Sequence, residues 1–323
     1  MRVVSLFAGA GGLDLGLVGA GHQVVWANDN FDDAAATYRR NIGNHIDTRD
    51  IRDVPSSEIP DCDIVVGGFP CQGFSVANWG RRTDDPRNQL FREMVRVISD
   101  KRPRYFIGEN VRGLISMSNG DALAEILKAF AAAGSGYNVR HCLVNAADYG
   151  VPQTRVRLLI LGTRSDQPDI HCFPPAPTHA RPDLAEMLGV PPWQSVGDAL
   201  AHFPEPEGDE GIPNHSRSLY KLTFNGHLGH RFVDPQRPAP TVTARGDERG
   251  GVVVLHHPGN RRRMTARELA AVQSFPDTFV FVGTKTSAYR QIANAVPPRL
   301  GRALGEMFSG LGRASLSPAI DAA

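Results

Sequence analysis

The fold is decided by ten residues near the start of the chain, Val3-Val4-Ser5-Leu6-Phe7-Ala8-Gly9-Ala10-Gly11-Gly12. The first five predict a buried strand, and the glycines predict a tight turn that lies close to a ligand. A helix is expected to begin at Leu13. A strand, a glycine-rich turn and a helix in this order open a nucleotide-binding α/β unit. We therefore predict an α/β fold whose first turn binds a cofactor.

Acidic residues narrow the chemistry of that cofactor. The dinucleotide pattern G-x-G-x-x-G, counted from Gly9, needs a glycine where this chain has Asp14, which argues against a pyrophosphate site. A second predicted strand, residues 23–27, leads to Asp29, and an acid at that strand end is placed to accept hydrogen bonds from ribose hydroxyls. Asp50 is placed to take an adenine amino group. A ribose without phosphates is what S-adenosylmethionine offers, so we predict that cofactor.

A single cysteine stands at the end of another predicted strand. Residues 63–66 predict a short buried strand, and it is followed by the stretch Gly67-Gly68-Phe69-Pro70-Cys71-Gln72-Gly73-Phe74-Ser75. Ligands bind at the carboxyl ends of strands in open α/β sheets, so Cys71 is a candidate nucleophile. The alternative is a small buried apolar residue, which is the usual role of a free cysteine. Residues 76–89 have no apolar period and predict a loop that closes over a substrate.

A carboxylate and two arginines complete the candidate site. The predicted strand 105–108 runs into Glu109, whose burial is costly unless the carboxyl group is paired or protonated. The alternative for Glu109 is a helix cap or an ion pair with the loop that follows. Arg155 and Arg157 stand just before the predicted strand 158–161, so on a strand they share a face and can both point at one anion or one carboxylate. Two exposed arginines on an edge strand are the alternative.

The composition argues against several classes of protein. Of 323 residues, 41% are hydrophobic and 21% are charged, as in an ordinary soluble globular protein. The four cysteines form no Cys-x-x-Cys pair, so neither a disulfide framework nor a metal site is expected, and a reducing cytoplasm fits best. The first strand is too short and too soon interrupted for a signal peptide or a membrane span. A net charge of +1 does not by itself indicate a nucleic-acid binder.

The character of the sequence changes near Ser165. Prolines become frequent, and a loop-rich second module is predicted over residues 165–281. Within residues 212–249, six basic residues stand against three acidic ones, which favours an anionic partner. Residues 238–243 predict an edge strand. Thr265-Ala266-Arg267-Glu268 fits a capping box that starts a helix.

Taken together, these motifs resemble the DNA (cytosine-5) methyltransferases, over nearly the whole chain and in the family's own order. The matching motifs are the first cofactor motif (Phe7 through Gly12), the catalytic loop (Gly68 through Gln72), the catalytic carboxylate (Glu109-Asn110-Val111), the arginine motif (Gln153 through Arg157), the strand supporting target recognition (Arg237 through Thr243) and the returning cofactor motif (Gln291 through Pro298). The family more often has glutamate at the position of Asp29 and glycine at that of Ala293. The first departure shortens a ribose contact, and neither alters the expected chemistry.

The resemblance implies the Rossmann-like fold of S-adenosylmethionine-dependent methyltransferases, a mixed and mostly parallel sheet with helices on both faces. A second, smaller, loop-rich target-recognition domain is expected beside it. The implied division is a catalytic and cofactor-binding domain (1–164), a target-recognition domain (165–281) and a C-terminal segment (282–323) that returns to the catalytic domain. The implied function is a sequence-specific DNA (cytosine-5) methyltransferase of the bacterial restriction–modification type, acting in the cytoplasm of a prokaryotic cell.

The resemblance also implies roles for single residues. Cys71 attacks carbon 6 of a cytosine flipped out of the duplex, which enables carbon 5 to take the methyl group of S-adenosylmethionine. The products are 5-methylcytosine and S-adenosylhomocysteine. Glu109, kept protonated in an enclosed site, meets nitrogen 3 of the ring, while Arg157 holds the base and Glu109 in register and Arg155 helps. No residue stands out as the base for the carbon 5 proton, which is left to water.

The remaining predicted site residues form two groups. Those expected to bind the cofactor are Phe7, Ala8, Gly9, Gly11, Gly12, Asp29, Asn30, Asp50, Ile51, Pro70, Leu90, Asn294 and Val296. Those expected to bind DNA are Gln72, Ser75, Arg81, Gln153 and Thr243. The expected partners are double-stranded DNA and a restriction endonuclease that acts on the same site, and the default state is a monomer.

Three other functions are considered beside this one. A cytosine-5 methyltransferase acting on transfer RNA resembles the same pattern, and the sizeable recognition module favours DNA over it. A nicotinamide-dependent oxidoreductase needs the glycine that Asp14 replaces, and it leaves Cys71 and Glu109 without a role. A catalytically dead DNA-binding protein on the same fold is disfavoured because Cys71, Glu109 and Arg157 are all intact.

Overall fold

The structure, a computed structural model, describes residues 1–70, 90–206, 211–217, 233–243, 255–259 and 262–308. The predicted nucleophile and three predicted DNA contacts lie outside the described residues; they are Cys71, Gln72, Ser75 and Arg81. The predicted closing loop 76–89 lies outside them as well.

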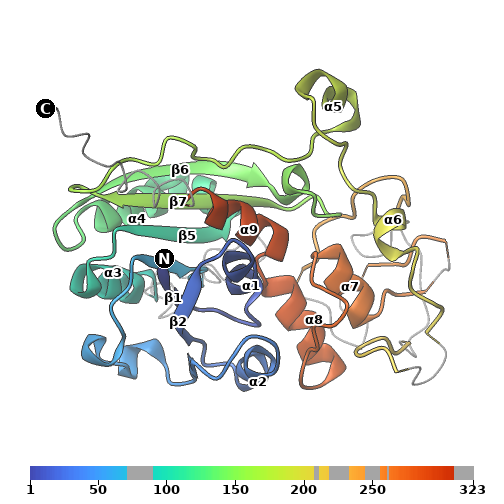
Figure 1. The fold of residues 1–323 in the computed structure, drawn as a ribbon, viewed down its shortest axis with the longest axis horizontal. Coiled ribbons are helices and arrows are strands. Elements are labelled where there is room, and N and C mark those ends of the chain that lie inside the picture. Colours follow the sequence, from blue (N-terminus) through green and yellow to red (C-terminus); the bar gives the residue numbers. More distant parts are fainter. Residues whose placement is uncertain (71–89, 207–210, 218–232, 244–254, 260–261, 309–323) are drawn as a thin grey trace, which may run out of the picture.

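Strands of the described residues form one seven-stranded sheet in the order β3-β2-β1-β4-β5-β7-β6 (Figure 1). They are β1 (Arg2–Leu6), β2 (Gln23–Asn28), β3 (Ile46–Asp47), β4 (Ile64–Gly67), β5 (Tyr105–Val111), β6 (Tyr137–Asn145) and β7 (Val156–Arg164). Neighbouring strands from β3 to β5 are parallel, and β7 runs antiparallel to both β5 and β6. The sheet is therefore mixed and mostly parallel, as predicted.

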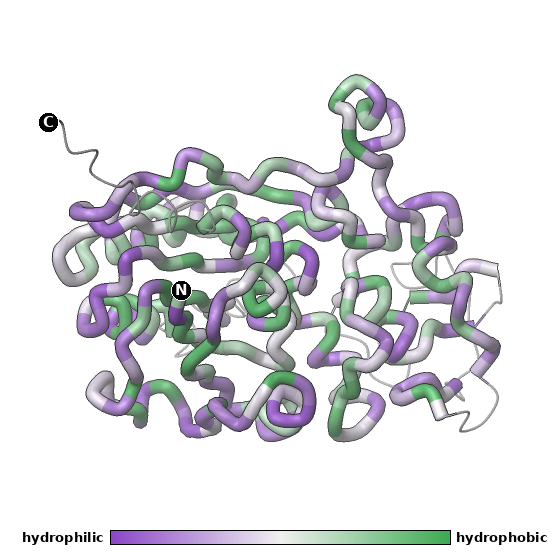
Figure 2. Tube along the Cα trace, in the orientation of Figure 1, coloured by the Kyte–Doolittle hydropathy of each residue, from purple (hydrophilic) through white to green (hydrophobic). Residues whose placement is uncertain are grey.

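Helices cover both faces of the sheet because its strands carry apolar side chains on both sides. The helices are α1 (Gly12–Gly19), α2 (Asp32–Asn41), α3 (Leu90–Lys101), α4 (Asp121–Ala131), α5 (Pro182–Leu188), α6 (Val196–Leu200), α7 (Ala266–Val272), α8 (Lys285–Asn294) and α9 (Pro298–Glu306). On one face, Val3 of β1 shares a buried cluster with Leu17 of α1 and Leu300 of α9. On the other face, its neighbour Val4 shares a cluster with Met94 of α3. In Figure 2 the central strands are accordingly rich in hydrophobic residues.

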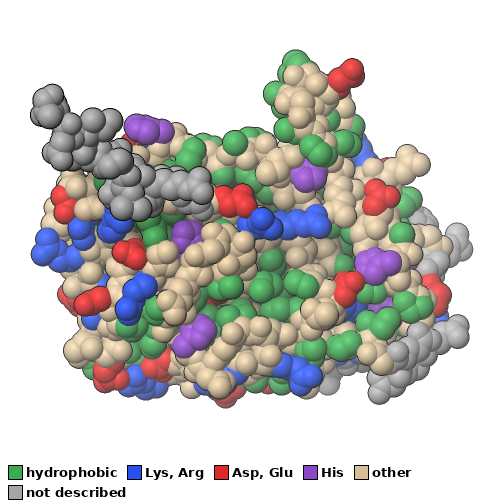
Figure 3. All heavy atoms as spheres, in the orientation of Figure 1, with side chains coloured by type: hydrophobic (Ala, Val, Ile, Leu, Met, Phe, Trp, Pro, Cys, Tyr) green, Lys and Arg blue, Asp and Glu red, His purple; other side chains and the backbone are tan. Residues whose placement is uncertain are grey.

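A third buried cluster joins α8 to the predicted recognition module. From that module it includes residues of α6 and α7, as well as Val233, Val242 and Leu255. The chain then returns to the first face, where α9 crosses α1 so closely that a Cβ atom on Gly16 would lie 2.3 Å from the Pro298 carbonyl oxygen. Helix α5 stands away from the body (Figure 1) and carries the exposed apolar side chains that Figure 3 shows in green, Leu184, Met187 and Leu188. Among the described helices, none combines the length and the apolar character needed to cross a bilayer.

Several predicted boundaries change in the structure. The first strand ends at Leu6 and not at Phe7, because Phe7 has a φ of 55°, which no strand residue can adopt. Strand β5 continues to Val111, so Glu109 lies inside the strand and not after it. The predicted edge strand 238–243 is present only as a single bridge between Gln153 and Ala239. Strand β6 was not predicted, because only Tyr137 and Val144 of its nine residues are buried and its polar residues leave no regular apolar pattern.

Candidate active site

The carboxyl ends of four parallel strands lie level with one another. Leu6 at the end of β1 pairs with Asn28 on one side and with Gly67 on the other, and Gly67 pairs with Gly108. The residues that follow these strand positions are therefore neighbours in space. Parallel α/β sheets bind ligands at this edge, and the predicted cofactor loop, Gly68 and the predicted catalytic carboxylate all lie there.

The cofactor loop has no room for side chains at two of its glycines. Gly11 has a φ of +86°, and a Cβ atom on it would lie 2.8 Å from the Tyr38 ring. A Cβ atom on Gly12 would lie 2.3 Å from the carbonyl oxygen of Val296. The loop is thus held between α2 and the residues that follow α8, which brings together the two predicted cofactor motifs from opposite ends of the chain.

Asp29 lies beside this loop, where a carboxylate that binds the ribose hydroxyls was predicted. One of its oxygens accepts a hydrogen bond from the Gly9 N–H (2.8 Å) and the other accepts one from the Phe31 N–H (2.9 Å). Burial raises the pKa of Asp29, and these two hydrogen bonds partly offset the effect. The carboxylate is therefore fixed against the loop before any ligand arrives.

The predicted adenine-binding carboxylate is engaged by a neighbouring arginine. Asp50 accepts hydrogen bonds from Arg52 Nε (2.8 Å) and Nη2 (2.7 Å), and these lower the pKa of Asp50 to about 2. Asn30 Nδ2 contacts the same carboxylate at 3.4 Å. Ile51 is buried beside it.

The other predicted cofactor residues take different places. Val296 lies against Gly12, whereas Asn294, the last residue of α8, is exposed. Pro70 and Leu90 flank the part of the chain that is not described.

Glu109 and Arg157 meet across the β5–β7 pairing. Val111 pairs with Arg157 and Glu109 pairs with Leu159, so the two charged residues are diagonal neighbours on adjacent strands. Arg157 Nε lies 3.0 Å from Glu109 Oε1, and both side chains are 12% exposed. Burial lowers the pKa of Arg157, and Glu109 opposes that effect. The prediction that Arg157 holds the carboxylate is thus matched by a direct contact.

The second oxygen of Glu109 faces the strand that leads to Cys71. A Cβ atom on Gly68 would lie 3.1 Å from Glu109 Oε2, so a side chain at that position would crowd the carboxylate. Glu109 thus uses one oxygen for Arg157 and turns the other toward Gly68.

Asn110 is a site residue to which sequence reasoning gave no role. Its Nδ2 donates to the carbonyl oxygen of Phe69 at 3.1 Å, two residues before Cys71, and its side chain is buried. The Phe69 ring packs against Phe91 and Phe130 in the core. Asn110 therefore fixes the backbone that delivers the cysteine, and the only signal in the sequence was its place next to Glu109.

Arg155 does not share a carboxylate with Arg157, and the prediction that both point at one is wrong. Strand β7 begins only at Val156, so the alternation that would place both side chains on one face does not extend to Arg155. Arg155 is 2% exposed, and its guanidinium donates to backbone carbonyl oxygens of Val242, Ala293 and Ala295. None of these side-chain hydrogen bonds goes to Glu109.

Gln153 is likewise misplaced as a DNA contact. It is fully buried, and its side-chain oxygen accepts a hydrogen bond from the Val242 N–H while its amide nitrogen donates to Gln273 Oε1. A residue with no exposed surface cannot reach DNA, so this prediction is contradicted. Thr243, the next predicted contact along, is half-buried, and its Oγ1 is buried without a hydrogen-bond partner.

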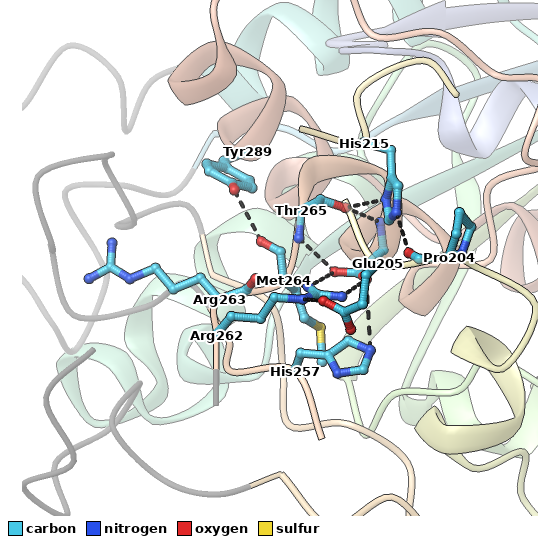
Figure 4. Close-up of polar contacts among 10 residues, drawn as sticks. Pro204, Glu205, His215, His257, Arg262, Arg263, Met264, Thr265 and Tyr289 are labelled. Carbon is cyan, nitrogen blue, oxygen red and sulfur yellow. Dashed lines mark hydrogen bonds and ion pairs between the residues drawn. The ribbon is translucent and has the colours of Figure 1, made fainter. Parts of the chain in front are cut away.

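The predicted recognition module is anchored at the N-terminus of α7 (Figure 4). Thr265 and Glu268 form the predicted capping box. Arg262 donates to both oxygens of Glu268 (2.8 and 2.7 Å) and to Glu205 (2.9 Å). His215 lies between Thr265 Oγ1 and the Pro204 carbonyl oxygen. Residues from three separate stretches thus converge on one helix end.

No metal centre competes with this site in the described part of the chain. The described residues contain no group of three or more His, Cys, Asp or Glu side chains that could hold a metal ion. Of the described cysteines, Cys62 and Cys142 are partly buried and Cys172 is exposed, and all three are free thiols.

Comparison with known proteins agrees with this geometry. The family model of C-5 cytosine-specific DNA methylases matches residues 1–187 and 212–309. The chain belongs to this family. Among its relatives, the Type II methyltransferase M.NgoFVII of Neisseria gonorrhoeae is 37% identical over 92% of this chain and 83% of its own length. The Type II methyltransferase M1.HphI of Haemophilus parahaemolyticus is 37% identical over 95% of this chain and 86% of its own.

Solved structures share the fold of this methyltransferase. The Dnmt2 methyltransferase of S. pombe matches with a TM-score of 0.68 at 22% identity, covering 96% of this chain and 99% of its own. The protein is therefore a sequence-specific DNA (cytosine-5) methyltransferase that uses S-adenosylmethionine, and the predicted family, fold, activity and cofactor are confirmed. The glycine loop without space for side chains, and Asp29 fixed beside it, fit that cofactor.

Proposed function

We propose that this methyltransferase binds its target cytosine beside Glu109 and Arg157, with Cys71 as the nucleophile. The observation that supports this is the 3.0 Å contact between Arg157 and one oxygen of Glu109, while the other oxygen faces Gly68, three residues before the cysteine. A carboxyl group held from one side in a largely buried pocket is suited to a fixed hydrogen bond with a ring nitrogen.

The proposed reaction forms and breaks bonds at carbon 5 and carbon 6 of the cytosine. The Cys71 thiolate forms a bond to carbon 6, and the electron pair of the 5,6 double bond moves into the ring, where Glu109 stabilises nitrogen 3 by donating a proton. When bound, S-adenosylmethionine supplies a methyl group that carbon 5 can attack. Water then removes the carbon 5 proton, the electron pair left behind expels the Cys71 thiolate, and nitrogen 3 returns its proton to Glu109. Arg157 keeps Glu109 in place throughout.

The wider assignment follows the same proposal. Residues 1–164 form the catalytic and cofactor-binding domain, residues 165–281 the target-recognition domain, and residues 282–323 return to the catalytic domain. The substrate is double-stranded DNA from which the target base is flipped. The enzyme acts as a monomer in the cytoplasm of a prokaryotic cell, beside a restriction endonuclease that cuts the same sequence.

The test is methyl transfer to mixed-sequence plasmid DNA and to transfer RNA, read by base-resolution cytosine conversion. Wild type, Cys71→Ser, Glu109→Gln and the matched control Cys142→Ser are compared, because Cys142 is a thiol on β6 outside the site. We expect one short duplex motif to be converted by wild type and by Cys142→Ser, and no conversion by the other two. Modification of RNA alone, or full activity of Cys71→Ser, would contradict the proposal.

A further inference from the structure

The surroundings of Arg155 are unusual for a cation. The side chain is buried, and its guanidinium hydrogen bonds end on three backbone carbonyl oxygens, those of Val242 (3.1 Å), Ala293 (2.8 Å) and Ala295 (3.1 Å). Its Nε is buried without a partner. Burial lowers the pKa of Arg155 well below its ordinary value. Because an unpaired buried guanidinium is costly, an apolar side chain would serve stability alone at least as well.

The three carbonyl groups belong to two segments that the family resemblance assigns to different ligands. Val242 directly precedes Thr243 in the stretch that supports target recognition, 87 residues from Arg155 in sequence. Ala293 and Ala295 lie in the returning cofactor motif, 138 and 140 residues away. The next residue in that motif, Val296, lies against Gly12 of the cofactor loop. One side chain therefore holds a DNA-side segment and a cofactor-side segment together.

Arg155 is also close in sequence to the base pocket. Two residues further along, Arg157 contacts Glu109. The Arg155 backbone is fixed as well, because its N–H donates to Asn145 Oδ1 at 3.0 Å and its carbonyl oxygen accepts from the Ala146 N–H at 2.9 Å. A shift of either distant segment is thus transmitted to the start of β7.

Gln153 ties the same two segments a second time. Its side-chain oxygen accepts from the Val242 N–H at 3.0 Å, and its nitrogen donates to Gln273 Oε1 at 2.9 Å. Gln273 in turn donates to the Ile292 carbonyl oxygen at 2.7 Å. Two sets of hydrogen bonds therefore connect the recognition stretch to the end of α8. Arg155 connects them directly, and Gln153 connects them through Gln273.

We propose that Arg155 is a positioning residue through which cofactor binding and DNA binding strengthen each other. This rests on the proposed function of the Glu109–Arg157 pocket. When either ligand orders its segment, the shared guanidinium orders the other, so the second ligand binds with a smaller loss of conformational entropy. Such coupling is reciprocal, and each ligand must raise the affinity of the other by the same factor.

The chain offers a matched control in Arg267. It is fully buried, and its guanidinium also donates to three backbone carbonyl oxygens, those of Pro213 (3.1 Å), Pro276 (2.9 Å) and Phe279. Those three carbonyl groups all lie within residues 165–281, so Arg267 joins parts of one predicted module and does not join the two segments that Arg155 joins. Replacement of either arginine by lysine removes the same hydrogen-bonding fork from a similar environment.

The experiment measures the dissociation constant of S-adenosylhomocysteine by calorimetry, with and without a duplex that carries the methylated site. The ratio of the two constants is the coupling factor, and thermal unfolding of each variant reports stability separately. For wild type we expect a factor of at least about 5, and for Arg155→Lys one below about 2. Arg267→Lys is expected to keep the wild-type factor although it loses stability. Arg155→Met, which keeps a long unbranched side chain without donors, is expected to lose the coupling as Arg155→Lys does.

Each outcome decides the matter. A wild-type factor near 1, an unchanged factor in Arg155→Lys or Arg155→Met, or an equal loss in Arg267→Lys overturns the inference. The methylation assay on wild type distinguishes failure of this inference from failure of the proposed function. If wild type methylates DNA but its coupling factor is near 1, only the inference is overturned.

Discussion

Replacement of Asp14 by asparagine is predicted to stabilise the protein at neutral pH. Asp14 is fully buried in α1, next to the cofactor loop, and accepts hydrogen bonds from Ser5 Oγ (2.7 Å) and the Tyr38 hydroxyl (2.8 Å). Burial raises the pKa of Asp14 from its ordinary value of 3.8 to about 6, and the two hydrogen bonds offset only part of that rise. An ionised carboxylate is therefore kept in the core at neutral pH against a desolvation penalty.

The size of the effect follows from this pKa. A carboxyl group whose pKa is raised on folding binds a proton more readily in the folded chain. Its contribution to the free energy of unfolding is thus fully present below pH 3.8 and is lost as the pH rises through about 6. The whole loss is about 3 kcal/mol at about 1.36 kcal/mol per pH unit, and about 2 kcal/mol of it falls between roughly pH 4.5 and 7.5. Asparagine has nearly the same shape and does not ionise.

The assay is urea unfolding followed by circular dichroism at several pH values across that window, on wild type and Asp14→Asn. The unfolding free energy of the variant, relative to wild type, should rise by about 2 kcal/mol from the lowest to the highest pH. Tyr38→Phe removes a hydrogen-bond donor to the Asp14 carboxylate. In this variant, the loss of stability with rising pH should occur at higher pH than in wild type. Parallel pH curves for wild type and Asp14→Asn would refute the reasoning.

Three further outcomes are expected. Gly12→Ala should weaken S-adenosylhomocysteine binding at least about tenfold by calorimetry, because the added Cβ atom would lie 2.3 Å from the Val296 carbonyl oxygen; unchanged affinity would count against the loop geometry. Asn110→Ala should slow single-turnover methyl transfer about tenfold while DNA affinity is kept, because the Phe69 carbonyl group loses its donor; a loss of affinity alone would contradict this. Glu268→Gln should lower the free energy of unfolding by about 2 kcal/mol, because the buried guanidinium of Arg262 keeps only the half-exposed Glu205 as a charged partner, and a change in thermal unfolding below about 1 kcal/mol would speak against that.

Features that depend on neighbouring residues could be predicted from the sequence. The glycine turn after the first strand needs backbone conformations and close contacts that only glycine allows, so Gly11 and Gly12 identify it by themselves. The capping box is a four-residue pattern, and Thr265 and Glu268 form it as predicted. Asp29 was placed correctly beside the cofactor loop because the ends of parallel strands meet at one edge of a sheet.

Features that depend on distant partners could not be predicted. Whether Arg155 shares a face with Arg157 depends on where β7 begins, and its own partners are 87 to 140 residues away. Gln153 is polar, which suggests exposure, yet it is buried because its hydrogen bonds are satisfied by Val242 and Gln273. The sequence carries no local sign of either pairing.

The role of Asn110 could not be predicted from the sequence either. Its neighbour Glu109 attracts attention as a buried carboxylate, whereas an amide at a strand end has many ordinary roles. Only the position of the Phe69 carbonyl oxygen, 3.1 Å from Asn110 Nδ2, shows that it holds the cysteine turn. Tertiary structure was needed to tell a positioning residue from a surface amide.

The role of Cys71 as the nucleophile is tested most directly by a duplex that carries 5-fluorocytosine at the methylated position. Fluorine at carbon 5 cannot leave as a proton does, so the bond from the nucleophile to carbon 6 should persist after methyl transfer. With S-adenosylmethionine present, we predict a covalent protein–DNA complex whose mass includes one added methyl group and whose DNA is attached to the peptide that contains Cys71. Absence of a complex while unfluorinated DNA is methylated, or attachment at another residue, would contradict the account.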